Sequence, residues 1–233
     1  MFKLTGLHIT IGQRLLFKQN VDIALVNGLY GLIGRNGSGK STLFNTIIGQ
    51  HKSYEGSILV NDVELDSLGN DFSREIAIVK THPDVYGDLT VEDVLWLGRT
   101  PYQNLLGIRK KEDQVIIDKA LNDLGLSTFK ETQYSNLSDG EKQLVMIGRA
   151  IVQDTPILLL DEPLAFLDLV NQKEVLSILK SISENKVVVF STHHIHLLND
   201  VCDDVLMIHD NELNTIGKSN DYTKEITSIF GLN

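Results

Sequence analysis

The segment from Gly34 to Thr42 combines closely spaced glycines with one lysine and three hydroxyl residues. Glycine lets the backbone curl so that successive N–H groups point inward at phosphate oxygens, and the lysine adds a positive charge. The spacing matches the pattern G-x-x-x-x-G-K-S, which lies between a strand and a helix. We therefore predict that phosphate groups bind here. The candidate residues are Gly34, Arg35, Asn36, Gly37, Ser38, Gly39, Lys40, Ser41 and Thr42.

A second candidate segment, Asp161-Glu162-Pro163, follows the apolar run 157–160. Four apolar residues are typical of a buried strand, and ligands bind at the carboxyl ends of strands in open α/β sheets. We predict that Asp161 and the hydroxyl of Ser41 hold Mg²⁺, and that Glu162 is the general base for an attacking water. The two segments together predict hydrolysis of ATP, with Mg²⁺ as a cofactor.

Length and composition limit the kinds of partner. The 233 residues suit one sizeable domain. The net charge of −10 argues against a nucleic-acid partner, because neutralising phosphates requires clustered Lys and Arg. One cysteine, Cys202, excludes an internal disulfide. No apolar run approaches the roughly 20 residues that cross a bilayer, so we expect a cytoplasmic protein that reaches a membrane only through protein partners.

Strand signals dominate the first third of the chain. Residues 21–25 alternate between apolar and polar or small types, and Asn27-Gly28 precedes the apolar residues 29–33, which predicts a hairpin turn. Residues 58–65, with Asn61-Asp62 at their centre, predict a second hairpin. Further strands are predicted at residues 76–79, 157–160 and 187–190.

Helix signals dominate the middle of the chain. Thr90 and Asp93 form a capping-box pattern, Gly125 closes an apolar-periodic stretch over 112–124, and Ser138 opens a third helix. Further helices are predicted at residues 171–183 and 221–233.

These elements predict an α/β protein built as a single domain over residues 1–233. We expect a P-loop NTPase core with a mostly parallel sheet, an N-terminal antiparallel β subdomain and an inserted α-helical subdomain. Residues 1–84 and 151–233 form the core and the β subdomain in this prediction, and residues 85–150 form the helical subdomain.

Three further segments resemble motifs of the ABC transporter ATPases, and they follow the order found in that family. Residues 136–143 (Asn-Leu-Ser-Asp-Gly-Glu-Lys-Gln) resemble its signature motif. Residues 164–168 resemble its D-loop, and residues 191–193 resemble its switch-histidine loop. With the phosphate loop, the resemblance covers nearly the whole chain.

The resemblance implies a homodimer in which two copies share each ATP. Ser138 and Gly140 of one copy then face the γ-phosphate held by the other, Asp168 lies in the D-loop, and His193 senses the γ-phosphate as a catalytic residue. It also implies permease subunits as partners and a place at the inner face of the cell membrane. Independently of function, Ser138 and Glu141 form a capping box that starts a helix, and a helix N-terminus attracts anions.

Some residues depart from the family pattern. Thr81 stands where a glutamine usually contacts Mg²⁺ and the attacking water, and His82 could take that role instead. Ile11 lies near the place of the aromatic ring that usually stacks on adenine, so we expect binding to depend mostly on the phosphates. Asp139 and Glu141 place carboxylates in the signature, where the family has Gly and Gln.

Two short segments resemble importers of one subclass. Residues 137–141 (Leu-Ser-Asp-Gly-Glu) and 97–102 (Leu-Gly-Arg-Thr-Pro-Tyr) are similar to segments in ATPases that serve iron–siderophore, haem and cobalamin uptake. We therefore predict the ATP-hydrolysing subunit of such an importer. Two alternatives remain: an ABC ATPase that acts on DNA or ribosomes, and a weakly hydrolysing regulatory ATP binder.

Overall fold

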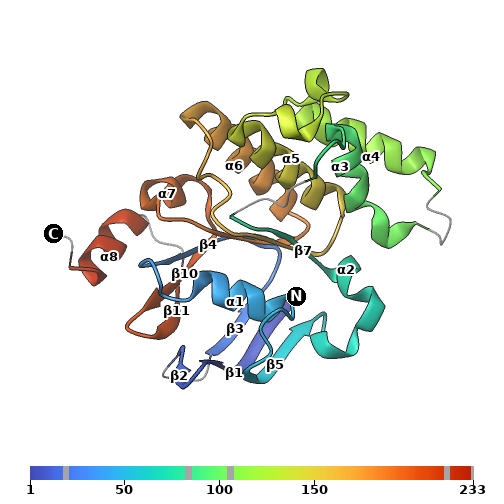
Figure 1. Cartoon of the computed structure of the whole chain (residues 1–233). Helices are drawn as coiled ribbons and strands as arrows, with labels where there is room; N and C mark the ends of the chain where they lie inside the picture. Colours follow the sequence, from blue (N-terminus) through green and yellow to red (C-terminus); the bar gives the residue numbers. More distant parts are fainter. Residues whose placement is uncertain (18–20, 82–85, 104–107, 218–220, 232–233) are drawn as a thin grey trace.

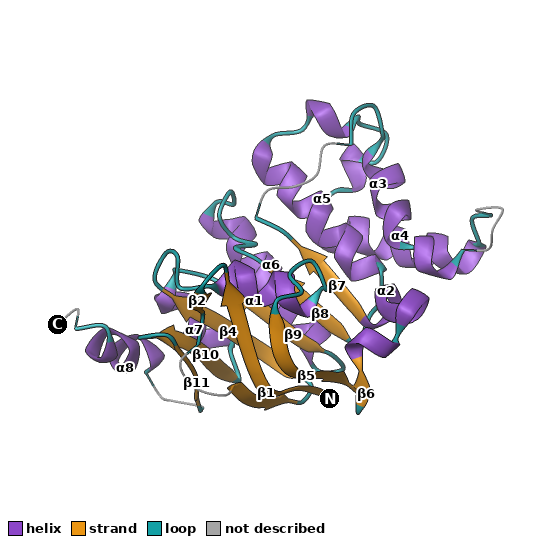
Figure 2. Cartoon of the chain, turned by 60° about the horizontal axis from the view of Figure 1, so that its bottom comes forward, coloured by secondary structure: helices purple, strands orange, loops and turns teal. Residues whose placement is uncertain are grey.

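The computed structural model describes residues 1–17, 21–81, 86–103, 108–217 and 221–231. Two sheets and several helices form layers (Figure 1). Helices α3, α4, α5 and α6 lie on one side of the larger sheet, and α1 lies with the smaller sheet on the other side. Seen from below, α3, α4 and α5 gather at one end of the molecule and α8 lies at the opposite end (Figure 2).

The larger sheet has six strands in the order β11-β10-β4-β9-β8-β7. All neighbouring pairs are parallel except β10–β11, which is antiparallel. The prediction of a mostly parallel sheet is therefore confirmed. Its strands are β4 (Gly28–Gly34), β7 (Ile76–Val79), β8 (Ile157–Leu160), β9 (Val187–Ser191), β10 (Asp204–His209) and β11 (Glu212–Ile216).

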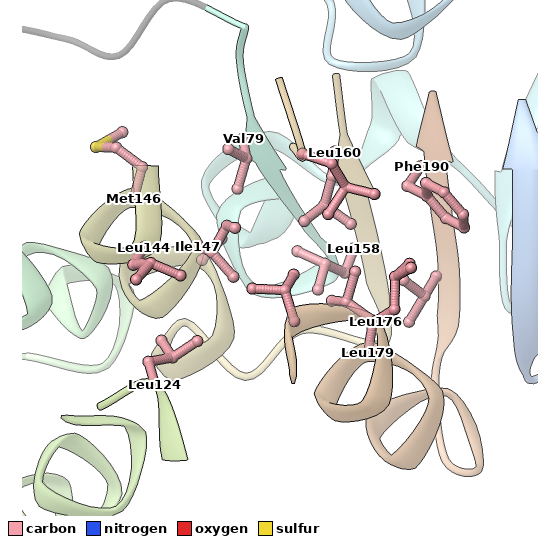
Figure 3. Packing of buried hydrophobic residues seen from close by; sticks show 14 of the residues in the cluster. Val79, Leu124, Leu144, Met146, Ile147, Leu158, Leu160, Leu176, Leu179 and Phe190 are labelled. Atoms are coloured by element: carbon pink, nitrogen blue, oxygen red, sulfur yellow. The ribbon is translucent and has the colours of Figure 1, made fainter. Parts of the chain in front are cut away.

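Both faces of this sheet are buried, and alternate residues of one strand enter different cores. Leu158 and Leu160 pack with residues of α5 and α6, whereas Ile157 and Leu159 pack with the smaller sheet and α1. Figure 3 shows the first of these clusters, in which Ile147 of α5 faces the strands. Because every side chain of β8 is covered, the strand reads as a continuous apolar run.

The smaller sheet is antiparallel and lies near the N-terminus, as predicted. Its strands are β1 (Phe2–Ile11), β2 (Arg14–Leu15), β3 (Val21–Leu25), β5 (Tyr54–Val60) and β6 (Val63–Glu64). Strands β5 and β6 form the predicted hairpin. Asn61 and Asp62 have φ of 50° and 64° at its turn, the backbone that Asn and Asp adopt more readily than other side chains.

The hairpin predicted around Asn27-Gly28 is wrong. Strand β3 pairs with β1 in the smaller sheet, whereas β4 pairs with β9 and β10 in the larger one. The Gly28 N–H donates to Lys186 O at 3.0 Å, so the chain crosses between sheets at this point. The physical reason is burial: β3 is buried on one face only, whereas β4 is a longer apolar strand that is covered on both faces and takes two parallel neighbours.

Two helices begin at the caps that the sequence indicated, and the other predicted helices begin within two residues of their predicted starts. Thr90 caps α3 (Val91–Gly98) and Ser138 caps α5 (Asp139–Val152), each with a complete capping box. Gly125, at φ 66°, follows α4 (Lys111–Asp123). The remaining α-helices are α1 (Lys40–Ile47), α2 (Phe72–Glu75), α6 (Leu169–Ser183), α7 (Leu198–Val201) and α8 (Tyr222–Ile229). Within the part of the chain that the structure describes, no helix has the length and apolar character needed to span a bilayer.

A buried ion pair ties three of these helices together. The Arg99 guanidinium, which follows α3, lies 2.8 Å from Asp113 of α4 and donates to Val152 O of α5 at 2.7 Å. Both side chains are less than a tenth exposed. Removing either partner would leave a buried charge without compensation. The contact therefore links the C-terminal end of α5 to α3 and α4.

Candidate functional site

The phosphate loop joins β4 to α1, as the motif requires. Gly39 is the N-cap of α1 at φ 108°, and a Cβ built there would collide with the side chain of Leu16. A Cβ on Gly34 would lie 2.5 Å from Ser38 Oγ and 2.9 Å from Ile208 O. Glycine at these positions is required by the left-handed backbone in the first case and by close packing in the second.

A cavity of about 450 Å³ opens over this loop. Lys40 is largely buried, and its Nζ donates to Gly34 O at 2.9 Å, which holds the ammonium group at the cavity. An ammonium group and the N-terminus of α1 suit a polyanion. The lining residues are Ile11, Leu16, Asn36, Gly37, Ser38, Gly39, Lys40, Ser41, Thr42, Asp161 and Glu162.

Arg35 does not line this cavity. Its guanidinium donates to Phe230 O, just after α8, at 3.3 Å and lies 5.8 Å from the centre of the Phe230 ring. The sequence motif placed Arg35 among the phosphate-binding candidates, but the structure directs its side chain to the C-terminal helix.

The parallel sheet brings Asp161 to the same cavity. Strand β8 ends at Leu160, and the Asp161 N–H donates to Val79 O at 2.8 Å. The carboxylate is buried and accepts a hydrogen bond of 2.7 Å from Ser191 Oγ, at the end of β9. A carboxylate near the Ser41 hydroxyl provides the hard oxygen donors that Mg²⁺ prefers.

Ser191 is a site residue whose role the sequence analysis did not predict. Its hydroxyl donates to Asp161 and also accepts from the Glu162 N–H at 2.8 Å. One fully buried hydroxyl therefore orients both acidic residues. A serine directly after the apolar run 187–190 was the available signal, but its partners lie about 30 residues away in the chain.

Glu162 and His193 are in direct contact. The Glu162 Oε2 lies 3.0 Å from His193 Nδ1, and Glu162 has φ 50°, in the left-handed region that is rare for a non-glycine residue. Strain of this kind is found at functional sites. The Glu162 side chain, which lines the cavity, is 17% exposed, and the His193 side chain beside it is 58% exposed. Burial, with neighbouring His193 and His196, lowers the pKa of His194.

Thr81 lies beside the acidic segment because β7 and β8 are parallel neighbours. Its Oγ1 donates to Asp161 O at 3.3 Å. His82, the alternative for the same role, lies outside the described residues. Ile11 and Leu16 line the cavity with aliphatic side chains. Ile11, near the place where the family usually has an aromatic ring for adenine, therefore offers no ring for stacking.

The signature residues do not belong to this cavity. The Ser138 Oγ and N–H both lie within 2.7 Å of Glu141 Oε2, and these hydrogen bonds lower the pKa of Glu141. Glu141 thus caps α5, and its negative charge does not offset the positive charge of the phosphate loop. Asp168 is the N-cap of α6 and accepts from the Val170 and Asn171 N–H groups. Among the described residues that line the cavity, neither Ser138, Gly140 nor Asp168 occurs.

The chain is similar to a large group of known proteins. The family model described as "ABC transporter" matches residues 19–165. The achromobactin transport ATP-binding protein of Dickeya dadantii is 34% identical over 217 residues, covering 90% of this chain and 80% of that protein. The cobalamin import ATP-binding protein of Halobacterium salinarum is 33% identical over 91% of this chain. This chain spans only about half of that relative, 54% of its length.

Solved structures show the same fold. A metal-chelate type ABC transporter in an inward-facing conformation aligns with a TM-score of 0.83 and 28% identity, over 99% of this chain and 88% of that one. A bacterial ABC transporter cassette solved as a dimer aligns with a TM-score of 0.80 and 25% identity, over 94% and 99% of the two chains.

Proposed function

This chain belongs to the ABC transporter family, and from that membership we propose that it is the ATP-hydrolysing subunit of an importer for an iron–siderophore, haem or related metal chelate. The observation that carries the proposal is the convergence of Lys40, Asp161 and Glu162 on one cavity, with His193 in contact with Glu162. The substrate class is supported by relatives that are named for achromobactin transport, cobalamin import and iron(3+)-hydroxamate import.

We assign ATP binding to the loop residues that line the cavity. Lys40 binds the β- and γ-phosphates, and backbone N–H groups from Asn36 to Ser41 surround them. Ser41 and Asp161 hold Mg²⁺, which when bound neutralises charge on the phosphates. The aliphatic Ile11 leaves the adenine with weak contacts, so that the phosphates supply most of the affinity.

We assign proton transfer to Glu162. Its carboxylate accepts a proton from the attacking water, and a base in this role contributes a factor of roughly 10²–10⁴ to the rate. His193 holds the carboxylate in place through the contact at 3.0 Å and also senses the γ-phosphate. Because His193 is exposed beside Glu162, a second copy of the chain can cover the pair and exclude water.

We propose that two copies share each nucleotide. Ser138 and Gly140 lie at the start of α5, away from the cavity of their own chain, so they serve the ATP that is bound to the partner copy. Asp168 lies in the loop that passes between the two sites. The γ-phosphate then bridges the copies, and ADP, which lacks it, does not. Because each copy carries a charge of −10, the copies repel each other when ATP is absent.

The remaining assignments follow from the family. Permease subunits embedded in the membrane bind this chain at the cytoplasmic face, and they select the cargo together with an external receptor. Residues 85–150 form a helical subdomain that carries the signature and is inserted into the core of residues 1–84 and 151–233. Nucleic acid is not a partner in this proposal, because the chain is acidic.

Turnover and oligomeric state test the proposal together. Glu162→Gln should slow hydrolysis by roughly 10²–10⁴-fold while ATP still binds, and ATP-bound dimers should accumulate in size-exclusion chromatography with light scattering. The exposed Glu112→Gln on α4 is the matched control and should hydrolyse ATP normally. A Glu162→Gln protein that binds ATP and stays monomeric would contradict the shared site.

Adding an arginine to the same variant tests the signature. Ser138→Arg places a bulky side chain where phosphate should bind and should dissolve the Glu162→Gln dimer. Ser127→Arg, at another exposed serine of the helical region, is the control and should leave the dimer intact. Co-purification of a membrane protein with the tagged chain tests the transporter assignment separately.

A further inference from the structure

The loop that carries Glu162 is held by two buried glutamines from different helices. We call residues 162–168 the acidic loop. Gln172 of α6 donates through Nε2 to Leu164 O at 3.2 Å and to Leu167 O at 3.0 Å. Gln143 of α5 donates through Nε2 to Pro163 O at 3.2 Å. Three carbonyls of the loop, those of Pro163, Leu164 and Leu167, therefore accept from side chains, and Leu164 O also accepts from the Leu167 N–H.

The bond from Gln143 is the one nearest to the proposed general base. Pro163 follows Glu162, whose φ of 50° persists only if its surroundings hold it there. Proline has no N–H, so its carbonyl is the backbone group by which this residue can be held. Pro163 is buried, and without Gln143 its carbonyl would lose this partner.

The side-chain amide of Gln143 is buried, and burial of an amide costs free energy unless it forms hydrogen bonds. The side chain is 0% exposed, and within the described residues its Oε1 accepts no hydrogen bond. An apolar side chain of similar length would fill the same space without an unsatisfied acceptor. The bond to Pro163 O is what the amide provides here.

One helix connects this bond to the signature. Gln143 lies one turn after Gly140 on α5, and a Cβ built on Gly140 would lie 3.0 Å from Phe166 O. The same face of α5 therefore touches the acidic loop at two points, Pro163 and Phe166. A shift of the helix start at Ser138 reaches the acidic loop through these two contacts.

We infer that Gln143 is a positioning residue that holds Pro163, and through it the Glu162 carboxylate, and so links the helix that starts at Ser138 to the general base. This inference rests on the proposed role of Glu162. It predicts that Gln143 affects the hydrolytic step and leaves nucleotide binding intact, because Gln143 does not line the cavity.

Steady-state kinetics of Gln143→Met in the assembled transporter test this inference. Methionine keeps the length and removes the donor, so we expect kcat to fall about tenfold, part of the roughly 10²–10⁴-fold that a general base contributes. The KM for ATP should stay within about twofold, since no ground-state contact is lost. The control is Gln153→Met: Gln153 follows α5 and donates to Ser73 O and Ile76 O, far from Glu162, so kcat should not change.

A double-mutant cycle separates positioning from a general loss of packing. If Gln143 acts through Glu162, Gln143→Met should not lower the residual rate of Glu162→Gln any further. Additive losses, a raised KM at unchanged kcat, or a kcat equal to that of Gln153→Met would each overturn the inference. Full turnover in Glu162→Gln alone would instead overturn the proposed function. If the methionine variant does not fold, Gln143→Asn keeps the amide but draws it back by one methylene, and the same outcomes apply.

Discussion

Replacing Ser191 by alanine removes the hydroxyl that orients both acidic residues. Ser191 Oγ donates to the Asp161 carboxylate at 2.7 Å and accepts from the Glu162 N–H at 2.8 Å, and the residue is fully buried. A hydrogen bond to a charged group contributes about 1.5–3 kcal/mol, and a buried N–H without a partner costs about 1–3 kcal/mol. Because the two bonds share one hydroxyl, we expect Ser191→Ala to lower the free energy of unfolding by about 3 kcal/mol.

Urea unfolding measures this loss directly. Trp96 is the single tryptophan of the chain and is 3% exposed, so its fluorescence reports unfolding. With a slope of about 3 kcal/mol per molar urea, the midpoint should fall by about 1 M. The matched control is Ser183→Ala: Ser183 is also buried, but among the described residues its Oγ donates only to Lys180 O of its own helix, at 2.7 Å. Its loss should stay below about 1 kcal/mol.

The same variant should need more Mg²⁺ for half-maximal ATP hydrolysis, because Asp161 loses the bond that orients its carboxylate. Equal urea midpoints for Ser191→Ala and Ser183→Ala would refute the reasoning about stability. An unchanged Mg²⁺ requirement would separately refute the claim that Ser191 orients the metal-binding carboxylate.

Further substitutions test single contacts. Lys40→Ala should abolish ATP hydrolysis and greatly weaken ATP binding in a calorimetric titration, and an unchanged affinity would exclude this loop as the nucleotide site. Gly39→Ala should lower the melting temperature and the ATP affinity, because φ of 108° disfavours a Cβ that also meets Leu16; normal values for both would contradict the geometry. Thr81→Gln restores the glutamine that usually contacts Mg²⁺ and the attacking water, so it should not lower ATP turnover and could raise it. Loss of activity in a folded, assembled complex would contradict the assignment of this position. Burial raises the pKa of Cys202 to about 12, so a thiol reagent at pH 8 should react only after urea is added.

The sequence determined the features that depend on neighbouring residues. The glycine pattern from Gly34 to Gly39 specified a phosphate loop between a strand and a helix, and the structure has both. Ser138 with Glu141, and Thr90 with Asp93, specified helix starts that the structure confirms to the residue. These features are local, because a cap or a tight turn is satisfied within a few residues. The apolar run 157–160 likewise indicated a strand buried on both faces.

The tertiary structure decided contacts between distant segments. Asn27-Gly28 has the composition of a hairpin turn, but β4 pairs with the parallel strands β9 and β10 and not with β3. Burial of both faces of an apolar strand outweighs a local turn preference. Ser191 bonds Asp161 and Glu162, and Gln143 bonds Pro163, across 20 to 30 residues of sequence. Nothing in the local sequence names such partners. These contacts follow from strand order and helix packing, which bring buried polar side chains next to the backbone and carboxylate groups with which they form hydrogen bonds.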